Sequence, residues 1–232
     1  MQPELLPLRL PRLALFDLDG TLVDSVPDIA VALNRALVEL GRPEAGLDEV
    51  RAWVGTGARD LAARAISRDM RGSDDDAAVE TLYSRYLAHY ARRVCVETTI
   101  YPGVQECLEF LRTRGVTLAV VTNKPEGIAT ELLATLGLAS AFAMVLGGDT
   151  LPWKKPDPRP LLHAMEQFDM AAAQTLMIGD SATDIYAARR AGIDCACVTY
   201  GYHRGEDLPS LAPRLLLDSL AELPGHFAER AS

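Results

Sequence analysis

The sequence predicts an α/β protein with a Rossmann-like parallel sheet as its core and an all-helical cap domain inserted into that core. A short apolar stretch, Leu13–Phe16, has no polar face, as expected of a strand that is buried on both sides. About 70 residues of helical pattern follow it, and from residue 100 onward short β-branched stretches alternate with helical ones. We expect residues 1–25 and 96–232 to form the core and residues 26–95 to form the helical domain.

Apolar side chains at helical spacing predict four helices in the inserted domain. Pro27 is a natural first helical residue, Gly41 ends the first helix, and the Gly55-Thr56-Gly57 stretch ends the second. We expect no strand among these residues. The expected helices cover residues 27–40, 47–54, 61–66 and 74–90.

Beyond residue 100, repeated strand–helix alternation predicts a parallel sheet with right-handed crossovers. The expected strands after the first are residues 117–121, 143–146, 175–178, 195–199 and 215–217. The expected helices are residues 104–114, 126–136, 160–168 and 182–191, and most of them are followed by a glycine.

Polar side chains stand at or just beyond the carboxyl end of each of the first four expected strands. Because these ends share one edge of a parallel sheet, we expect the side chains to converge there. Carboxylates suit a hard cation such as Mg²⁺, while a hydroxyl and lysines suit an anionic phosphoryl group. In chain order the residues are Asp17 and Asp19, Thr122 and Lys124, Lys154 or Lys155, and Asp180 with Asp184.

Each of these residues also has a simpler structural interpretation. Asp and Gly are ordinary turn residues, Thr122 can simply end a strand, and Asp184 can be an acid in the first turn of a helix. A calcium-binding loop fits less well, because Leu22 stands where the EF-hand pattern requires glycine. The joint occurrence of polar groups at four strand ends favours the functional interpretation.

Composition excludes several kinds of partner. The formal net charge is −9 and no basic run occurs, which argues against nucleic acid and against an anionic membrane surface. No apolar stretch approaches the roughly 18 residues of a membrane span, and residues 1–11 lack a signal-peptide pattern. The four cysteines have no Cys-x-x-Cys spacing, which is typical of reduced thiols in the cytoplasm. We expect a cytoplasmic monomer or homodimer.

Lysine is unusually scarce in this chain. Of its 23 basic residues only Lys124, Lys154 and Lys155 are lysines, and all three stand near expected strand ends. The compact ammonium group is not replaced by the planar guanidinium of arginine in a tight pocket. The distribution therefore favours a role for lysine at the site.

The motifs at the strand ends resemble those of the haloacid dehalogenase superfamily of phosphotransferases, in order and over nearly the whole chain. Residues 26–95 occupy the place of that family's cap domain. Asp17-Leu18-Asp19-Gly20-Thr21 resembles the first motif, Thr122 the second, Lys155 the third, and Gly179-Asp180-Ser181 with Asp184 the fourth. Further stretches resemble the bacterial phosphoglycolate phosphatases within the superfamily: Trp53-Val54-Gly55, Tyr101-Pro102-Gly103, Thr122-Asn123-Lys124-Pro125 and Val198–Tyr202.

The resemblance implies roles for the carboxylates. Asp17 would attack phosphorus, and Asp19 would act first as general acid and then as general base. Mg²⁺ would bind Asp17, the backbone carbonyl of Asp19 and Asp180, and Asp184 would support the metal from nearby or through water.

The resemblance also implies the substrate-binding residues. Thr122 and Asn123 would hydrogen-bond the phosphoryl oxygens, and a lysine would neutralise Asp17 and the phosphate. We expect this lysine to be Lys155 rather than Lys154, because it precedes Pro156 as in the family pattern. In the cap, the substrate-facing residues are expected to be Gly55, Gly57 and, as an extra anion partner, Arg59.

The expected activity is Mg²⁺-dependent hydrolysis of small phosphate monoesters through an aspartyl-phosphate, with 2-phosphoglycolate as the favoured substrate. A sugar or amino-sugar phosphate is an alternative substrate, especially because Thr56 stands where close relatives often have Asn. A phosphomutase and a non-catalytic phosphate-binding regulator are further alternatives. The pair Asp17 and Asp19 argues against the regulator, because binding alone needs no acid or base.

Overall fold

The computed structural model describes residues 8–228, so most of residues 1–11, in which no signal-peptide pattern was found, lie outside the described residues. Its core is a six-stranded sheet in which every neighbouring pair of strands is parallel, and the predicted α/β class is confirmed. The strands are β1 (Leu13–Phe16), β4 (Thr117–Val121), β5 (Met144–Leu146), β6 (Thr175–Gly179), β7 (Asp194–Val198) and β8 (Leu215–Leu217).

The strand order across the sheet is β5-β4-β1-β6-β7-β8. The chain therefore builds one half of the sheet outward from β1, returns, and builds the other half on the opposite side of β1. In open parallel sheets, ligands bind outside the carboxyl ends of the strands at such a reversal. The topology places the carboxyl end of β1, between β4 and β6, at the expected ligand position.

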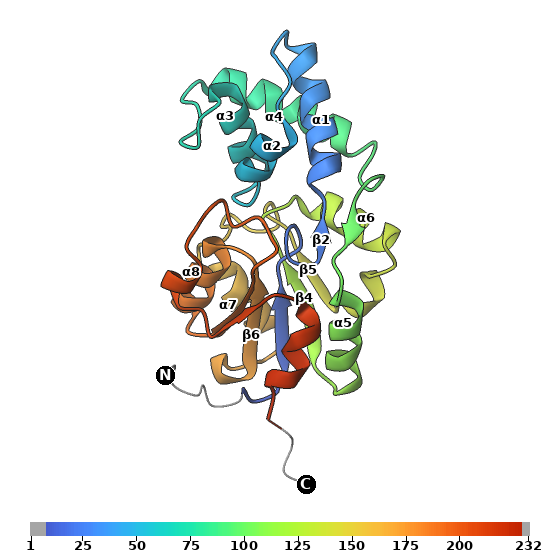
Figure 1. The fold of residues 1–232 in the computed structure, drawn as a ribbon, viewed down its shortest axis with the longest axis vertical. Coiled ribbons are helices and arrows are strands. Elements are labelled where there is room, and N and C mark those ends of the chain that lie inside the picture. Colours follow the sequence, from blue (N-terminus) through green and yellow to red (C-terminus); the bar gives the residue numbers. More distant parts are fainter. Residues whose placement is uncertain (1–7, 229–232) are drawn as a thin grey trace.

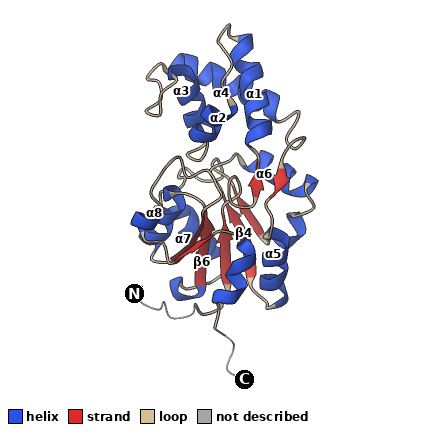
Figure 2. Cartoon of the chain, in the orientation of Figure 1, coloured by secondary structure: helices blue, strands red, loops and turns tan. Residues whose placement is uncertain are grey.

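Helices cover both faces of this sheet (Figure 2). Leu13 and Leu15 pack into one core cluster, Ala14 and Phe16 pack into the other, and none of the four is exposed. This two-sided burial explains why β1 has no polar face in the sequence. The covering helices are α5 (Val104–Thr113), α6 (Glu126–Thr135), α7 (Arg159–Gln167) and α8 (Ala182–Ala191). Short 3₁₀ segments lie at Ala139–Ala141, Ala172–Gln174, Pro209–Leu211 and Leu220–His226.

The inserted residues form a helical group that lies beyond the carboxyl edge of the sheet (Figure 1). It consists of α1 (Val26–Glu39), α2 (Leu47–Trp53), α3 (Ala58–Ser67) and α4 (Asp76–Tyr90). Helix α4 packs against both α1 and α3, and its buried side includes Val79, Leu82, Tyr86 and Tyr90. Within residues 8–228, no helix has the length and apolar character needed to cross a bilayer.

Residues 26–95 contain no strand, as expected, but a pair of short strands just outside these bounds was not predicted. Strand β2 (Val23–Asp24) pairs antiparallel with β3 (Thr99–Ile100), where the chain enters and leaves the helical group. Two-residue strands are too short to show a period in the sequence.

A second contact joins the same two connections. Asp28 Oδ2 accepts hydrogen bonds from the backbone N–H groups of residues 96, 97 and 98 at 2.9, 2.9 and 2.8 Å. It also accepts one from the Thr98 hydroxyl at 2.7 Å. Four donors on one buried carboxylate oxygen fix the outgoing and returning connections to each other.

Candidate active site

The carboxyl ends of the three central strands bring the predicted motifs together. Asp17 follows β1, Thr122 follows β4, and Asp180 follows β6. All three residues are buried. The backbone N–H of Asp17 donates to the carbonyl of Ile178 on β6, so the register of the sheet extends to the first acid of the motif.

The loop after β1 is shaped to approach Asp180 closely. Gly20 has φ +88°, a backbone conformation that residues with a Cβ rarely adopt. A Cβ at this position would also collide with Asp180 Oδ2. The Thr21 hydroxyl donates to Asp180 Oδ1 at 3.0 Å, and the backbone N–H of Tyr202 donates to Oδ2 at 2.6 Å. The glycine therefore allows the first and fourth motifs to meet.

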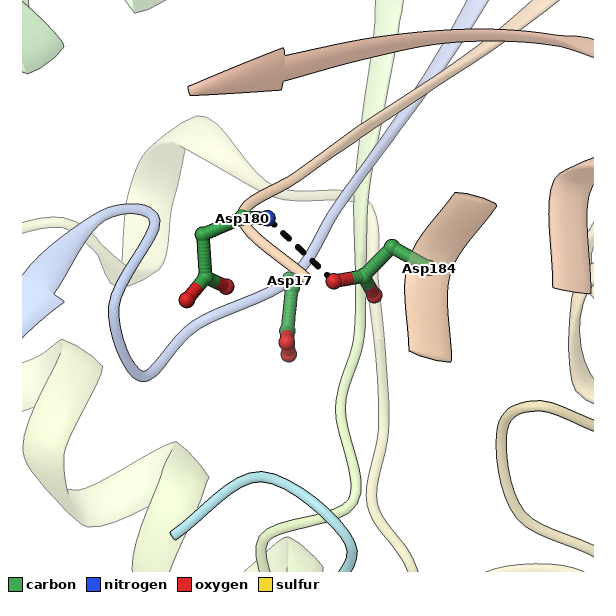
Figure 3. A group of neighbouring side chains, drawn as sticks. All are labelled: Asp17, Asp180 and Asp184. Atoms are coloured by element: carbon green, nitrogen blue, oxygen red, sulfur yellow. Dashed lines mark hydrogen bonds between the residues drawn. The ribbon is translucent and has the colours of Figure 1, made fainter. Parts of the chain in front are cut away.

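Asp17, Asp180 and Asp184 form a buried carboxylate cluster (Figure 3). One oxygen from each lies within 4.8 Å of the others. Burial raises the pKa of Asp17 to about 6, although the Lys155 charge opposes the rise. Burial, with the charges of Asp184 and Asp17, raises the pKa of Asp180 well above its ordinary range. Three oxygen ligands that repel one another in a buried site fit a divalent cation.

Within this cluster Asp184 is the most heavily bonded. Its Oδ2 accepts from the backbone N–H groups of Asp180 and Ser181, both at 3.2 Å, and from the Ser181 hydroxyl at 3.0 Å. Its Oδ1 pairs with Lys155 at 2.7 Å. Asp184 thus holds the Asp180 loop and Lys155 in place, in keeping with a supporting position beside a metal.

The two neighbouring lysines point to different parts of the molecule. Lys155 is almost fully buried, with Nζ 3.0 Å from Asp17 Oδ1 and 2.7 Å from Asp184 Oδ1. Burial alone would lower its pKa, but the charges of Asp17 and Asp184 raise the pKa of Lys155 above its usual value. Lys154 is 39% exposed and pairs with Asp60 of α3 at 3.1 Å. Of the two, Lys155 is the lysine in contact with the carboxylates.

Asn123 connects the sheet to the helical group through its side chain. Nδ2 donates to the carbonyl of Lys155 at 2.9 Å and to the carbonyl of Gly55 at 3.1 Å. Its Oδ1 is buried and has no hydrogen-bond partner among the described residues. Buried acceptors are nearly always hydrogen-bonded, so Asn123 Oδ1 has room for one more donor.

A cavity lies between the sheet edge and the helical group. It contains about 420 Å³ of space not filled by protein atoms, part of it open to solvent. Asp17, Asp19, Thr122 and Asn123 line it from the core, and Gly55, Gly57 and Ala58 line it from the helical group. Arg59 does not line it: Arg59 is 45% exposed and pairs with Asp76 at 2.7 Å and with Glu80 at 2.5 Å.

Lys124 was expected at this edge of the sheet without a specific partner, and the structure makes it part of the site. Its Nζ lies 2.9 and 3.0 Å from the two oxygens of Asp19 and donates to the Tyr90 hydroxyl at 2.7 Å. Asp19 Oδ1 also accepts from the Ser25 hydroxyl at 2.5 Å. Two sequence signals pointed to Lys124: its place just beyond an expected strand end, and the scarcity of lysine in the chain.

Fold and site together define a class of protein: an α/β enzyme that gathers buried carboxylates and a lysine at a topological switch point. The family profile of haloacid dehalogenase-like hydrolases matches residues 14–198. The chain belongs to this family and is a hydrolase.

Individual relatives match nearly the whole chain. A phosphoglycolate phosphatase of Pseudomonas putida is 46% identical over 224 residues, which are 96% of this chain and 82% of that protein. One of Colwellia psychrerythraea is 44% identical over 211 residues, 90% of this chain and 93% of that protein. A crystal structure of a predicted phosphoglycolate phosphatase from Haemophilus somnus superposes with a TM-score of 0.85 at 35% identity, covering 91% and 96% of the two chains.

Proposed function

We propose that this protein is a Mg²⁺-dependent phosphatase that hydrolyses small phosphate monoesters, chiefly 2-phosphoglycolate to glycolate and phosphate. One observation carries the proposal: Asp17 and Asp19 line a single cavity, and each is paired with its own buried lysine. The relatives named phosphoglycolate phosphatase, which match most of the chain, support the choice of substrate.

In the first step, a carboxylate oxygen of Asp17 attacks phosphorus and the ester P–O bond breaks, which gives an aspartyl-phosphate. Asp19 donates a proton to the departing alkoxide, so the alcohol leaves in neutral form. Lys155, 3.0 Å from Asp17, offsets the negative charge that gathers around the transferred group.

In the second step, Asp19, now a carboxylate, takes a proton from water as the water oxygen attacks phosphorus. The bond from phosphorus to Asp17 breaks, which releases inorganic phosphate and restores the free carboxylate of Asp17 and the protonated Asp19. When bound, Mg²⁺ supplies positive charge that reduces the repulsion between the attacking carboxylate and the phosphate dianion. Asp17, the backbone carbonyl of Asp19, and Asp180 would hold it, with Asp184 in support.

We also propose that residues 26–95 act as a cap that excludes water from the reaction. The β2–β3 pair and the Asp28 contacts join the two connections at one place, which suits a hinge. Gly55 and Gly57, whose φ values are +123° and +114°, bring backbone rather than side chain to the cavity.

A turnover assay tests the proposed function. Phosphate release is measured for 2-phosphoglycolate, several sugar phosphates and several amino-sugar phosphates, with Mg²⁺ and with a chelator. We expect Mg²⁺-dependent turnover with the highest kcat/KM for 2-phosphoglycolate, and none in Asp17→Asn. Preference for a sugar phosphate would reassign the substrate, isomerised esters without phosphate release would indicate a mutase, and tight phosphate binding without turnover would indicate a regulator.

We propose the cytoplasm as the site of action. Cys95, Cys107, Cys195 and Cys197 are all unpaired, and the last three are buried. Burial raises the pKa of the Cys107 thiol to about 12, so this thiol stays protonated and inert. Unpaired cysteines are usual in a reducing compartment.

A further inference from the structure

The cavity has two walls of different chemistry. The wall from the core carries the polar groups that the proposed reaction uses. The wall from the helical group is largely apolar, apart from the backbone of the glycine loop. Its apolar residues are Ile29, Val54, Ala58, Leu61 and the ring of Tyr86. A neutral substrate tail would suit this wall, but an anionic tail would need a cation nearby, because an unpaired charge is expensive to bury.

Only one cationic side chain of the described residues lines this cavity, and it is Lys124. Lys155 does not line the cavity and is paired with Asp17 and Asp184. Lys154 and Arg59 pair with acids of the helical group and do not line the cavity. Among the described side chains that line the cavity, Lys124 is therefore the one cationic partner for an anionic group on the alcohol part of a substrate.

A substrate carboxylate can bind Lys124 by replacing one of the two oxygens of Asp19. Its side chain is 2% exposed, and its three N–H groups meet the two oxygens of Asp19 and the hydroxyl of Tyr90. One oxygen of Asp19 is enough to keep this ion pair, so a second carboxylate can take the other N–H. The Tyr90 ring also faces the ammonium, with its centroid 4.6 Å from Nζ, which holds the lysine against α4.

We propose that Lys124 determines specificity by binding a carboxylate on the alcohol part of the substrate, with Tyr90 as its positioning residue. The inference rests on the proposed phosphatase function and adds the group that recognises the substrate's second charge. A charge-assisted hydrogen bond in a buried site selects strongly, because a substrate without the carboxylate leaves the site's groups incompletely paired.

A matched pair of esters tests this inference: 2-phosphoglycolate and 2-hydroxyethyl phosphate, which replaces the carboxylate with a neutral CH₂OH group. The ratio of their kcat/KM values measures carboxylate recognition. Damage to Asp19 affects both esters alike, so it cancels in the ratio. We expect Lys124→Met to lower this ratio roughly 10- to 100-fold, mainly through KM for 2-phosphoglycolate. Lys124→Gln, which keeps polar contact with Asp19 but lacks the charge, should do the same, and Tyr90→Phe should lower the ratio less.

Lys154→Met is the control, because it removes a neighbouring lysine that does not line the cavity, and it should leave the ratio unchanged. Calorimetric titration with glycolate and with inorganic phosphate, in the presence of Mg²⁺, gives a readout that does not depend on turnover. Both Lys124 variants should lose glycolate affinity and keep phosphate affinity. If the wild type is active and the ratio and glycolate affinity survive in both variants, the role of Lys124 is overturned while the phosphatase proposal stands. If the wild type hydrolyses neither ester, the proposed function itself fails.

Discussion

Removing Lys155 is expected to damage both stability and activity, whereas removing its neighbour Lys154 should do little. Lys155→Ala leaves the buried carboxylates of Asp17 and Asp184 without their shared cation, and breaking a buried pair costs roughly 3–5 kcal/mol. At about 2–4 °C per kcal/mol for a chain of this size, the metal-free variant should melt on the order of 10 °C lower. The side chains of Lys154 and Asp60 are each 39% exposed, so loss of their ion pair should cost at most about 1 kcal/mol of stability.

Thermal unfolding in a chelator and steady-state kinetics with Mg²⁺ measure the two effects. Loss of the charge beside Asp17 should lower kcat by roughly 10²- to 10³-fold in Lys155→Ala. The stability defect should shrink at acid pH, where the carboxylates left behind are protonated and need no cation. Equal losses of melting temperature or of kcat in the two variants would refute the assignment of Lys155.

Three further outcomes are expected. Asp19→Asn should slow 2-phosphoglycolate far more than nitrophenyl phosphate, whose leaving group needs no proton, and equal slowing in a leaving-group series would exclude Asp19 as the acid. Gly55→Val should lower kcat/KM for 2-phosphoglycolate more than for nitrophenyl phosphate, because valine is strained at φ +123° and would disturb the loop; proportional losses would exclude a specificity role. The pKa of Asp17 rises from 3.8 to about 6 on folding, so ionisation of Asp17 lowers the free energy of unfolding of the metal-free protein by up to about 3 kcal/mol. This loss of stability is absent below about pH 4 and complete above about pH 6. Mg²⁺ should therefore raise the melting temperature more at about pH 7.5 than at about pH 5, and a pH-independent rise would contradict Asp17 as a ligand.

Local sequence was enough for the parts of the fold that repeat a simple pattern. The uninterrupted apolar stretch Leu13–Phe16 predicts a buried central strand, and it is one, because helices cover both faces of the sheet. The parallel topology then places residues after β1, β4 and β6 at one edge, so the meeting of Asp17 with Asp180 follows from connectivity.

Contacts made across the fold were beyond the reach of the sequence. Lys124 meets Tyr90, 34 positions earlier, only because α4 packs above the sheet edge. The family pattern favoured Lys155 over Lys154 as the site lysine, but the pairing of Lys154 with Asp60 of α3 could not be predicted. Arg59 was expected near the substrate, but the acids of α4 hold it outside the cavity lining.

The most direct test of the central claim is to look for the covalent intermediate on Asp17. Enzyme turning over 2-phosphoglycolate with Mg²⁺ is quenched in acid, digested, and mapped by mass spectrometry. We predict one phosphoryl group on the peptide that contains Asp17, absent from Asp17→Asn and from samples treated with a chelator. Steady turnover with no phosphoryl group on that peptide, or with the group on another residue, would contradict the account.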